Sequence, residues 1–343
     1  MPNQTPPTHR VTSFEVAERA GVNQSTVSRA LSGDTSITDA TREKVRQAAD
    51  ELGYRVDSRA ARLRSGKTST IAIVVITKPG VEATGINPFH YNLLGSVCAA
   101  ASDKGYQALV SFQSSSEQFY SDFVETRQAD AVVLIGTSTN DAAWAHHHAI
   151  LNREDVACWG SPYVDHRRVD SDNREGARVA VQRLLDGGNH KIAFIGDTRE
   201  SQPQFRERYD AYCTLADELG FESGPAIFEE GETRAAQGRR SARSLIESGR
   251  KFDGIFCSCD AMAFGVLEVL REKGLAVPDD VSVIGFDGLG SGAHSSPPLT
   301  TIEPDFARAG VLLVEFALGE TAEGTRPRAP VRLVERQSVK KPG

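Results

Sequence analysis

Four polar side chains lie close together in one short segment, and their amide, hydroxyl and guanidinium groups suit hydrogen bonding to a partner molecule. The four are Gln24, Ser25, Ser28 and Arg29. Val27, Ala30 and Leu31 lie in the same segment at helical spacing. The segment is therefore predicted to form a helix with a buried apolar side and an unusually polar outer face.

Residues 11–34 as a whole predict another helix before this one in the chain, with a tight turn between the two. Thr12 with Glu15 forms a capping box that defines the helix start. Gly21 ends that helix and Asn23 can cap the next. The expected apolar stripe of this helix consists of Phe14, Val16, Ala17 and Ala20. The pattern matches the helix-turn-helix, whose second helix enters the DNA major groove; an ordinary helical hairpin with a solvated face is the alternative.

The flanking segments define a small N-terminal domain. Residues 39–52 predict a third helix, so the DNA-binding headpiece is expected over residues 11–56. Residues 1–10 have no apolar region of the kind found in signal peptides and are expected to be a disordered arm. Residues 57–69 are rich in arginine and small residues, with Leu63 as the one bulky apolar side chain. They predict either a flexible linker or a helix that orders only against DNA.

From residue 70 onward, short apolar runs alternate with helical patterns. The expected strands are 70–77, 106–112, 130–136, 156–160, 191–196, 252–258 and 281–287. The expected helices are 90–104, 117–128, 141–151, 174–187, 205–219, 234–248, 261–273 and 305–318. This alternation predicts an α/β fold with parallel sheets. Because the region is long for one sheet, we expect two lobes with a cleft between them.

Several of these strands end in residues that could line the cleft. Ligands bind outside the carboxyl ends of strands in open parallel sheets. Trp159, Phe256 with Asp260, and Asp287 occur at such ends. For Trp159 and Phe256, packing in the core is the alternative.

The distribution of charge supports DNA binding by the front of the chain. The net charge of −7 by itself argues against a nucleic-acid partner. The first 67 residues, however, hold 11 Lys and Arg against 8 Asp and Glu, an excess of +3, and the remainder carries −10. The basic excess therefore lies where a DNA-binding module needs it.

Other classes of protein lack their usual signals in this sequence. No run of 18 apolar residues occurs, so no membrane span is expected. Five scattered cysteines suggest reduced thiols in the cytoplasm. The cysteines of residues 257–259 are interpreted as a buried strand end, and the three histidines of residues 146–148 as a solvated helix face. No nucleophile motif, phosphate loop, catalytic triad or metal set is found, so we expect no enzyme activity, no metal and no cofactor.

Taken together, the motifs resemble the lactose-repressor (LacI/GalR) family of bacterial transcription regulators. The matching headpiece stretches are VTSFEVAERAGVNQSTVSRAL and TREKVRQAADELGY. Further on, NPFH, SDNREGARVAVQRLL, KIAFIGD, FDGIFCSCDAMAFG, VPDDVSVIGFD and PPLTTI follow in the family's order. The resemblance implies an all-α helix-turn-helix headpiece, and an α/β two-lobed domain like the periplasmic binding proteins. It also implies a homodimer.

The resemblance assigns the residues that contact DNA. Gln24, Ser25 and Arg29 would face the base edges, where Gln suits adenine and Arg suits guanine. The residues placed as phosphate contacts are Ser28, Thr12, Thr41 and Arg42, with plain caps or surface residues as the alternative. In the hinge helix, Leu63 would wedge into a base step of the minor groove and Arg64 would follow it.

The resemblance also assigns an effector site in the cleft. The polar pair would be Arg208 and Asp287, which suit sugar hydroxyls. The other expected residues are Phe89, His90, Trp159, Phe256 and Asp260. Family members often carry Asn where this chain has Cys259, so the usual effector hydrogen bonds are in doubt there. Asn173 and Arg174 match a stretch where the family's chain crosses between lobes, and they are interpreted as structural.

These observations predict a cytoplasmic, effector-responsive repressor of carbohydrate-utilisation genes. Its partners would be a pseudo-palindromic operator, a sugar and a second copy of the chain. Two alternatives are a co-repressed regulator that senses a nucleobase and a stand-alone sugar receptor. The expected N-lobe spans residues 70–167 and 299–327, and the expected C-lobe spans residues 168–298 and 328–338.

Overall fold

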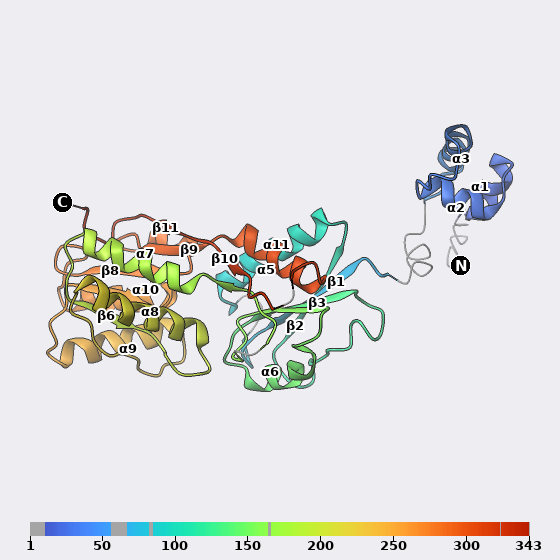
Figure 1. Ribbon diagram of the computed structural model, residues 1–343. Coiled ribbons are helices and arrows are strands. Elements are labelled where there is room, and N and C mark those ends of the chain that lie inside the picture. The colour runs from blue at the N-terminus through green and yellow to red at the C-terminus, as the bar shows by residue number, and fades with distance from the viewer. Residues whose placement is uncertain (1–10, 56–66, 82–84, 164–165, 323, 343) are drawn as a thin grey trace, which may run out of the picture. The chain divides into compact units, whose positions relative to one another are not determined.

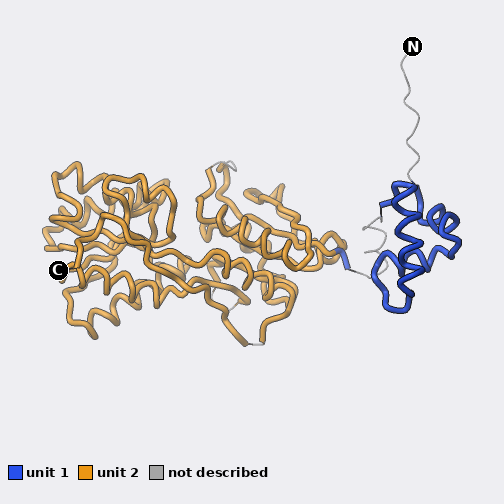
Figure 2. The backbone as a smooth tube through the Cα atoms, turned by 90° about the horizontal axis from the view of Figure 1, so that it is seen from above, with its two compact units in different colours: residues 1–68 blue, residues 69–343 orange. Residues whose placement is uncertain are grey.

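The computed structural model describes residues 11–55, 67–81, 85–163, 166–322 and 324–342. The chain divides into two compact units, residues 1–68 and residues 69–343 (Figure 2). The expected disordered arm and most of the expected hinge segment, including Leu63 and Arg64, lie outside the described residues.

Residues 11–55 of the first unit form three helices. Its helices are α1 (Ser13–Ala20), α2 (Gln24–Leu31) and α3 (Asp39–Leu52). Gly21 has φ 65°, a conformation that favours glycine, and it ends α1 as predicted. The Asn23 carboxamide oxygen accepts a hydrogen bond from the Thr26 amide at 2.8 Å and so caps α2. Val16, Val27 and Val45 form the fully buried centre, so the predicted helix-turn-helix is confirmed.

Phe14 departs from the expected apolar stripe of the first helix. Its side chain is 71 % exposed, whereas Val16 and Ala17 are buried. Helical periodicity assigns a residue to a side of the helix, but it does not say how far along the helix its neighbours reach. Phe14 therefore lies on the surface of this unit.

The second unit has two lobes, each built on a mainly parallel sheet (Figure 1). The N-lobe sheet has the order β2-β1-β3-β4. Its strands are β1 (Thr70–Ile76), β2 (Gln107–Gln113), β3 (Ala131–Gly136) and β4 (Val156–Trp159). The helices of this lobe are α5 (Pro88–Asp103), α6 (Asp141–His147), the 3-10 turn His148–Ile150 and α11 (Phe306–Ala317).

The C-lobe sheet has the order β11-β9-β8-β7-β6, with β11 antiparallel to β9. Its strands are β6 (Ile192–Ile195), β7 (Gly254–Cys257), β8 (Ser282–Phe286), β9 (Thr300–Pro304) and β11 (Val331–Val334). The helices are α7 (Asn173–Asp186), α8 (Pro203–Leu219), α9 (Arg234–Glu247), α10 (Asp260–Glu272) and the 3-10 turn Gly290–His294. We had expected the chain to return to the N-lobe near residue 299. Because β9 belongs to the C-lobe sheet, the chain returns only after Pro304.

The chain crosses between the lobes three times, near residues 168–173, 304–306 and 328–331. The short strands β5 (Asp170–Ser171) and β10 (Arg328–Ala329) pair in parallel and join the first and third crossings. The amide of Asp172 donates to the Ala329 carbonyl at 2.9 Å, and the amide of Asp305 donates to the Pro330 carbonyl at 2.8 Å. Backbone hydrogen bonds therefore hold all three crossings together.

The predicted helix over residues 117–128 is wrong, because this segment forms turns. The Gln113 carboxamide at the end of β2 donates to the Tyr120 carbonyl at 2.9 Å and accepts from the Tyr120 amide at 3.3 Å. A side chain from the sheet thus takes the backbone groups of Tyr120 that a helix would have used.

The histidines of α6 do not form a uniformly solvated face, as we had expected. His146 and His148 are exposed, but His147 is fully buried and its Nε2 lies 3.0 Å from the Gln113 carboxamide oxygen. Burial lowers the pKa of His147 to about 4. This histidine is therefore a neutral core residue.

Candidate DNA-binding face and effector pocket

The outer face of α2 presents three of the predicted base-contacting residues together. Ser25 and Arg29 are exposed, and Gln24 is half-buried. The Gln24 amide donates to the Ser13 hydroxyl at 3.1 Å, which ties the start of α2 to α1. The Arg29 Nε approaches the Ser25 carbonyl at 3.5 Å, at the limit of a hydrogen bond, so its guanidinium remains available to a partner.

The predicted phosphate contacts have other bonds within the headpiece. The Thr12 amide and hydroxyl both donate to Glu15, at 2.7 and 2.9 Å, which completes the predicted capping box. The Thr41 hydroxyl lies 2.9 Å from that of Thr38. Arg42 donates to the carbonyls of Asp34 and Ile37, each at 3.1 Å, and thereby holds the loop before α3. Ser28 is half-buried on α2. A phosphate contact by any of these four stays a prediction.

Phe14 is a surface residue of the headpiece, although its spacing had predicted a place in the apolar stripe of the first helix. It follows Ser13, the residue bonded to Gln24, and it exposes a large apolar ring. A single exposed apolar side chain is common on protein surfaces, so its exposure alone does not mark a contact site. The signal in the sequence was its place in the first turn of the helix, where a neighbouring helix need not cover it.

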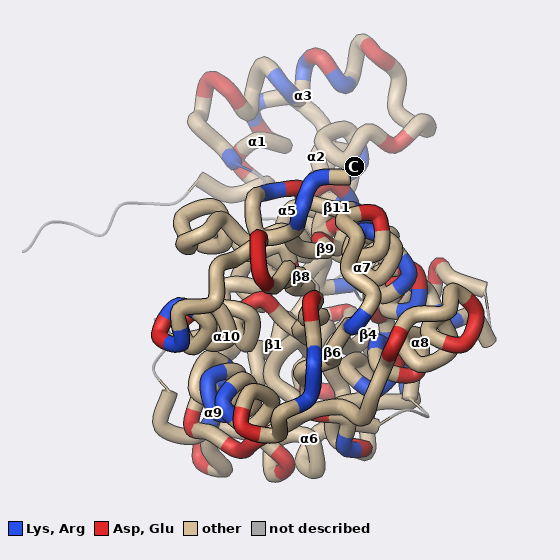
Figure 3. Tube along the Cα trace, turned by 90° about the vertical axis from the view of Figure 1, so that its left-hand side faces the viewer, with Lys and Arg blue, Asp and Glu red and all other residues tan. Residues whose placement is uncertain are grey.

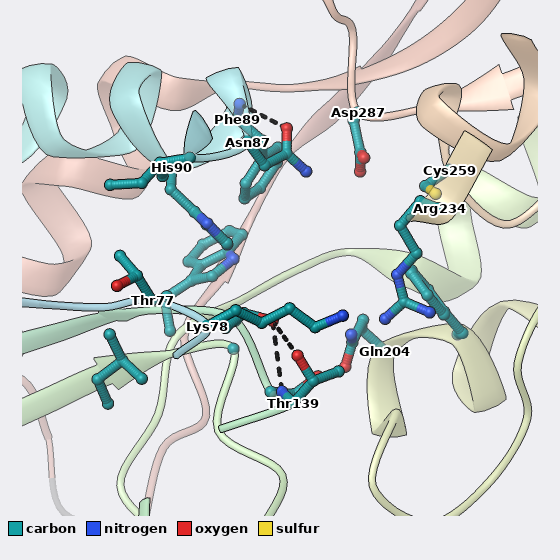
Figure 4. Close-up of a pocket in the computed structure, with 18 of the residues that line it drawn as sticks. Thr77, Lys78, Asn87, Phe89, His90, Thr139, Gln204, Arg234, Cys259 and Asp287 are labelled. Atoms are coloured by element: carbon teal, nitrogen blue, oxygen red, sulfur yellow. Dashed lines mark hydrogen bonds between the residues drawn. The ribbon is translucent and has the colours of Figure 1, made fainter. Parts of the chain in front are cut away.

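A pocket of about 300 Å³ lies between the two lobes of the second unit. Figure 4 shows side chains from both lobes facing it. Those labelled from the N-lobe are Thr77, Lys78, Asn87, Phe89, His90 and Thr139. Those labelled from the C-lobe are Gln204, Arg234, Cys259 and Asp287. Of the predicted effector residues, Phe89, His90, Trp159, Arg208 and Asp287 line it.

The N-lobe wall of this pocket is aromatic. Phe89 lies at the start of α5 with its ring centroid 5.7 Å from that of His90 and 6.0 Å from that of Trp159. The Asn87 carboxamide accepts from the Phe89 amide at 3.1 Å and so orients the first turn of α5. Burial lowers the pKa of His90 to about 4, so its ring is neutral near pH 7 and has one donor and one acceptor.

The C-lobe wall is polar and centred on Arg208 and Asp287, whose charged groups lie 3.7 Å apart. The Arg208 guanidinium donates to Asn173 at 2.9 Å and also to the Ser258 carbonyl, and it covers the ring of Phe286. Burial raises the pKa of Asp287 to about 7, although Arg208 and Arg234 oppose the shift. The Asp287 carboxyl therefore changes charge near neutral pH.

Two predicted effector residues do not line the pocket. Phe256 is fully buried and packs against Phe194, with ring centroids 5.2 Å apart. Asp260, the first residue of α10, uses one carboxylate oxygen to accept from Thr301 at 2.5 Å and the other to accept from the Leu289 amide at 2.7 Å. Both side chains support the wall from behind.

The pocket is also lined by residues that were not predicted as effector ligands, and four of them could contact a ligand. They are Lys78, Gln204, Phe205 and Arg234. Lys78 could have been found, because it is the second residue after the carboxyl end of β1. Arg234 and Phe205 come from the first turns of α9 and α8, and only the folded chain shows that these turns face the pocket. Cys259, noted in the sequence for replacing the family's Asn, also lines the pocket, and burial raises the pKa of its thiol to about 12.

Charges on the second unit are mixed along its helices. Figure 3 shows Lys and Arg segments distributed among Asp and Glu segments, and the arginines of α9 lie beside glutamates of α10. There Arg239 pairs with Glu268 and Arg243 with Glu272, each at 2.9 Å. Such paired surfaces attract nucleic acid less than a single-sign patch does. The basic excess of the first 67 residues is therefore the better candidate for DNA contact.

Known proteins resemble the chain along nearly its whole length. Residues 14–57 match the bacterial regulatory proteins of the lacI family, and residues 181–339 match a periplasmic binding protein-like domain. The HTH-type transcriptional regulator CelR of Thermobifida fusca is 31 % identical over 96 % of this chain and 98 % of that protein. The chain belongs to the LacI family. It is an effector-responsive, sequence-specific DNA-binding transcriptional regulator.

Other relatives of this LacI-family regulator agree with the assignment. The repressor CytR of Escherichia coli K12 is 29 % identical over 85 % of this chain and 84 % of that protein. A structure of a CelR–cellobiose complex is 28 % identical with a TM-score of 0.64, covering 96 % of this chain and all of that one. The lac repressor dimer bound to operator, at 24 % identity and a TM-score of 0.73 over 97 % of this chain and all of that one, shares the fold. The relatives are transcriptional regulators and not enzymes.

The described residues form neither a metal site nor a membrane-spanning helix. Within the described part of the chain, no three His, Cys, Asp or Glu side chains are grouped so as to hold a metal ion. No helix among the described residues is both long enough and apolar enough to cross a membrane.

Proposed function

We propose that this regulator is a repressor of carbohydrate-utilisation genes, and that a sugar in the pocket between its lobes switches its affinity for operator DNA. The observation that carries the proposal is the pairing of an aromatic wall, built on Phe89 and Trp159, with a polar wall built on Arg208 and Asp287. Aromatic faces suit the apolar faces of a pyranose, and an Arg–Asp pair suits its hydroxyls. Cellobiose is the first sugar to test, because the CelR structure contains it.

On DNA, the α2 face supports base contacts by Gln24, Ser25 and Arg29, since Ser25 and Arg29 are exposed on one helix and Gln24 stands beside them. The assigned phosphate contacts are Thr12, Ser28, Thr41 and Arg42. Leu63 would wedge into the minor groove with Arg64 beside it. Two copies of the headpiece would bind the two halves of a pseudo-palindromic operator. The protein would then work in the cytoplasm, associated with the nucleoid.

A homodimer has support in the edge strand β2. Leu109, Val110 and Phe112 are 37 %, 38 % and 39 % exposed on this strand. An exposed apolar edge strand tends to associate unless something covers it. We infer that a second copy of the chain covers β2. Sedimentation velocity of the full chain, which measures its oligomeric state, tests this.

The switch would work by population shift. A ligand that contacts both lobes stabilises one lobe arrangement more than another, and operator affinity changes by that difference. The pocket supports this, because its lining includes residues of β1, α5 and β4 on one side, and residues of α8 and α9 with Asp287, which follows β8, on the other.

A nucleobase co-repressor is the second candidate. The flat aromatic wall and the neutral His90, which carries both a donor and an acceptor, also suit a base. The headpiece argues against a stand-alone sugar receptor, since such a protein needs no DNA-binding face.

The test is a thermal-shift screen of the full chain against sugars, starting with cellobiose, and against nucleobases. A ligand at a hundred times its dissociation constant adds about 2.7 kcal/mol to stability. Each hit is then added to a gel shift on a duplex selected with the chain from a random library. A sugar that raises the melting temperature and releases the duplex supports the proposal. A nucleobase that tightens the complex, or a panel without any hit, contradicts it.

A further inference from the structure

The crossings between the lobes carry a charged network centred on Glu207. This residue lies on α8 in the C-lobe, and its carboxylate accepts two hydrogen bonds from Arg328, each at 3.0 Å. It accepts a third from the Asn173 amide at 3.0 Å. Arg328 is in β10 on the third crossing, and Asn173 directly follows the first crossing. One carboxylate therefore holds two crossings on a C-lobe helix.

The same network reaches the pocket. The Asn173 carboxamide oxygen accepts from Arg208 Nε at 2.9 Å, and both residues line the pocket. The guanidinium of Arg208 in turn faces Asp287 at 3.7 Å. Glu207 itself is not among the lining residues. It stands behind Asn173, one hydrogen bond away from the space that a ligand would fill.

The charges around Glu207 are balanced and partly shielded from solvent. Arg168 is 3 % exposed and contacts Asp170 at 2.6 Å and Glu207 at 3.8 Å. The side chains of Glu207 and Arg328 are 20 % and 30 % exposed. Burial by itself would raise the pKa of Glu207, but the hydrogen bonds from Arg328 and Asn173 outweigh it and leave the pKa below its ordinary value. The carboxylate is thus charged, and removing its charge leaves two arginines poorly compensated.

We propose that Glu207 is a positioning residue that couples the effector pocket to the arrangement of the two lobes. A ligand that draws Arg208 or Asn173 toward itself changes the hydrogen bond from Asn173 to Glu207. Glu207 transmits the change to Arg328 and so to the crossing strands. The inference rests on the proposed function in one respect, since it takes the pocket as the effector site. Coupling through a network requires a demonstration that both ends bias one movable element, here the crossings.

The C-lobe contains a matched control for this network. Glu335 accepts hydrogen bonds from Arg183 Nε at 2.9 Å and also from the terminal amino group of that guanidinium. Arg183 is buried, so this ion pair, like that of Glu207 with Arg168, involves a guanidinium with little access to solvent. This pair joins α7 to the segment after β11, within one lobe and away from the pocket and the paired strands β5 and β10. Glu335→Gln therefore removes the same type of interaction without touching the crossings.

The first measurement needs no effector. Hydrogen exchange of the full chain is followed at Asp170, Asp172 and Asp305, whose amides join the crossings. Operator affinity is measured by fluorescence anisotropy on the library-selected duplex. Glu207→Gln is expected to speed exchange at these amides and to change operator affinity by about twofold to 30-fold. Glu335→Gln is expected to leave both as in the wild type, even where it lowers the melting temperature. Equal behaviour of the two variants overturns the proposal.

A double-mutant cycle and a milder variant complete the test. Arg328→Met added to Glu207→Gln should change operator affinity little beyond either single change, because the two residues act as one pair. Additive effects would contradict a shared role. If Glu207→Gln does not fold, Glu207→Asp keeps the charge but shortens the side chain. It should show the same faster exchange at the crossings in a folded protein, and wild-type exchange would refute the coupling.

Outcomes for the coupling and for the proposed function are distinguishable. If no sugar binds but Glu207→Gln alters the crossings and operator affinity, the positioning role stands and the sugar assignment falls. If cellobiose or another sugar releases the wild type and Glu207→Gln equally well, the proposed function stands and the coupling falls.

Discussion

The headpiece and the cleft of the sensor unit are specified in different ways. In the headpiece, the cap at Asn23 and the turn at Gly21 act within a few residues of the helices they define. In the cleft, Phe89, Arg208 and Asp287 come from segments about 80 to 200 residues apart and meet only when two sheets have formed. The structure of the headpiece can therefore be predicted from local sequence signals, whereas the structure of the cleft depends on contacts between distant segments. Functions of the two regions should separate under mutation.

The strongest test of that separation is Arg29→Ala. Each lost bidentate base contact costs about 1–3 kcal/mol, and two half-sites double the loss. We expect specific duplex binding to fall far below the wild-type level, while thermal shifts with pocket ligands persist. Arg19→Ala is the control in the same unit, since Arg19 pairs with Glu51 at 2.5 Å on the surface. Similar losses for both variants would mean that only charge matters.

A second test concerns His147, whose burial the local sequence pattern did not predict. The pKa of His147 is lowered from 6.5 to about 4, so the folded state disfavours the proton that the unfolded state binds. Stability from this group is present above pH 6.5 and is lost as pH falls toward 4, by about 3 kcal/mol in all. Urea unfolding should show a flatter acid slope in His147→Gln. The exposed His146→Gln should keep the wild-type slope, and a slope that neither variant changes would count against a buried neutral His147.

Asp287→Ala tests the cleft from the opposite side. We expect operator binding to stay within about twofold of the wild type, because the headpiece is intact. The effector response, a coupling of about 1–3 kcal/mol in typical allosteric proteins, should disappear. Anisotropy titrations with and without the sugar found in the screen measure both. A normal response would place the effector site elsewhere.

The smallest expected effect is that of Phe14→Ala. Because the ring is 71 % exposed, its loss should leave the melting temperature of the headpiece unchanged. If the ring contacts DNA, operator affinity should drop by up to about tenfold, the value of one partly buried side chain. Unchanged affinity would mean that Phe14 does not contact DNA. A lower melting temperature would mean that the ring packs in the core of the headpiece.

Sequence patterns predicted the helices and strands of both regions better than they predicted the neighbours of individual side chains. Strand and helix alternation indicated the α/β lobes, and residues at strand ends, such as Trp159 and Asp287, indicated part of the pocket. Phe256 and Asp260 also lie near a strand end, yet they support the wall from behind. Position along a strand does not say which neighbours occupy the space beside a side chain.

By itself, the sequence determined the helix-turn-helix, the alternating fold and the separation of charge between the two units, because each depends on near neighbours or on composition. The folded chain was needed to show that residues 117–128 form turns with Gln113 bound to the backbone of Tyr120, that His147 is buried and that Arg234 faces the pocket. Glu207 gave no signal at all in the chain. Its role arises from three partners on α7, β10 and the first crossing, and chain folding alone brings these within reach of one carboxylate.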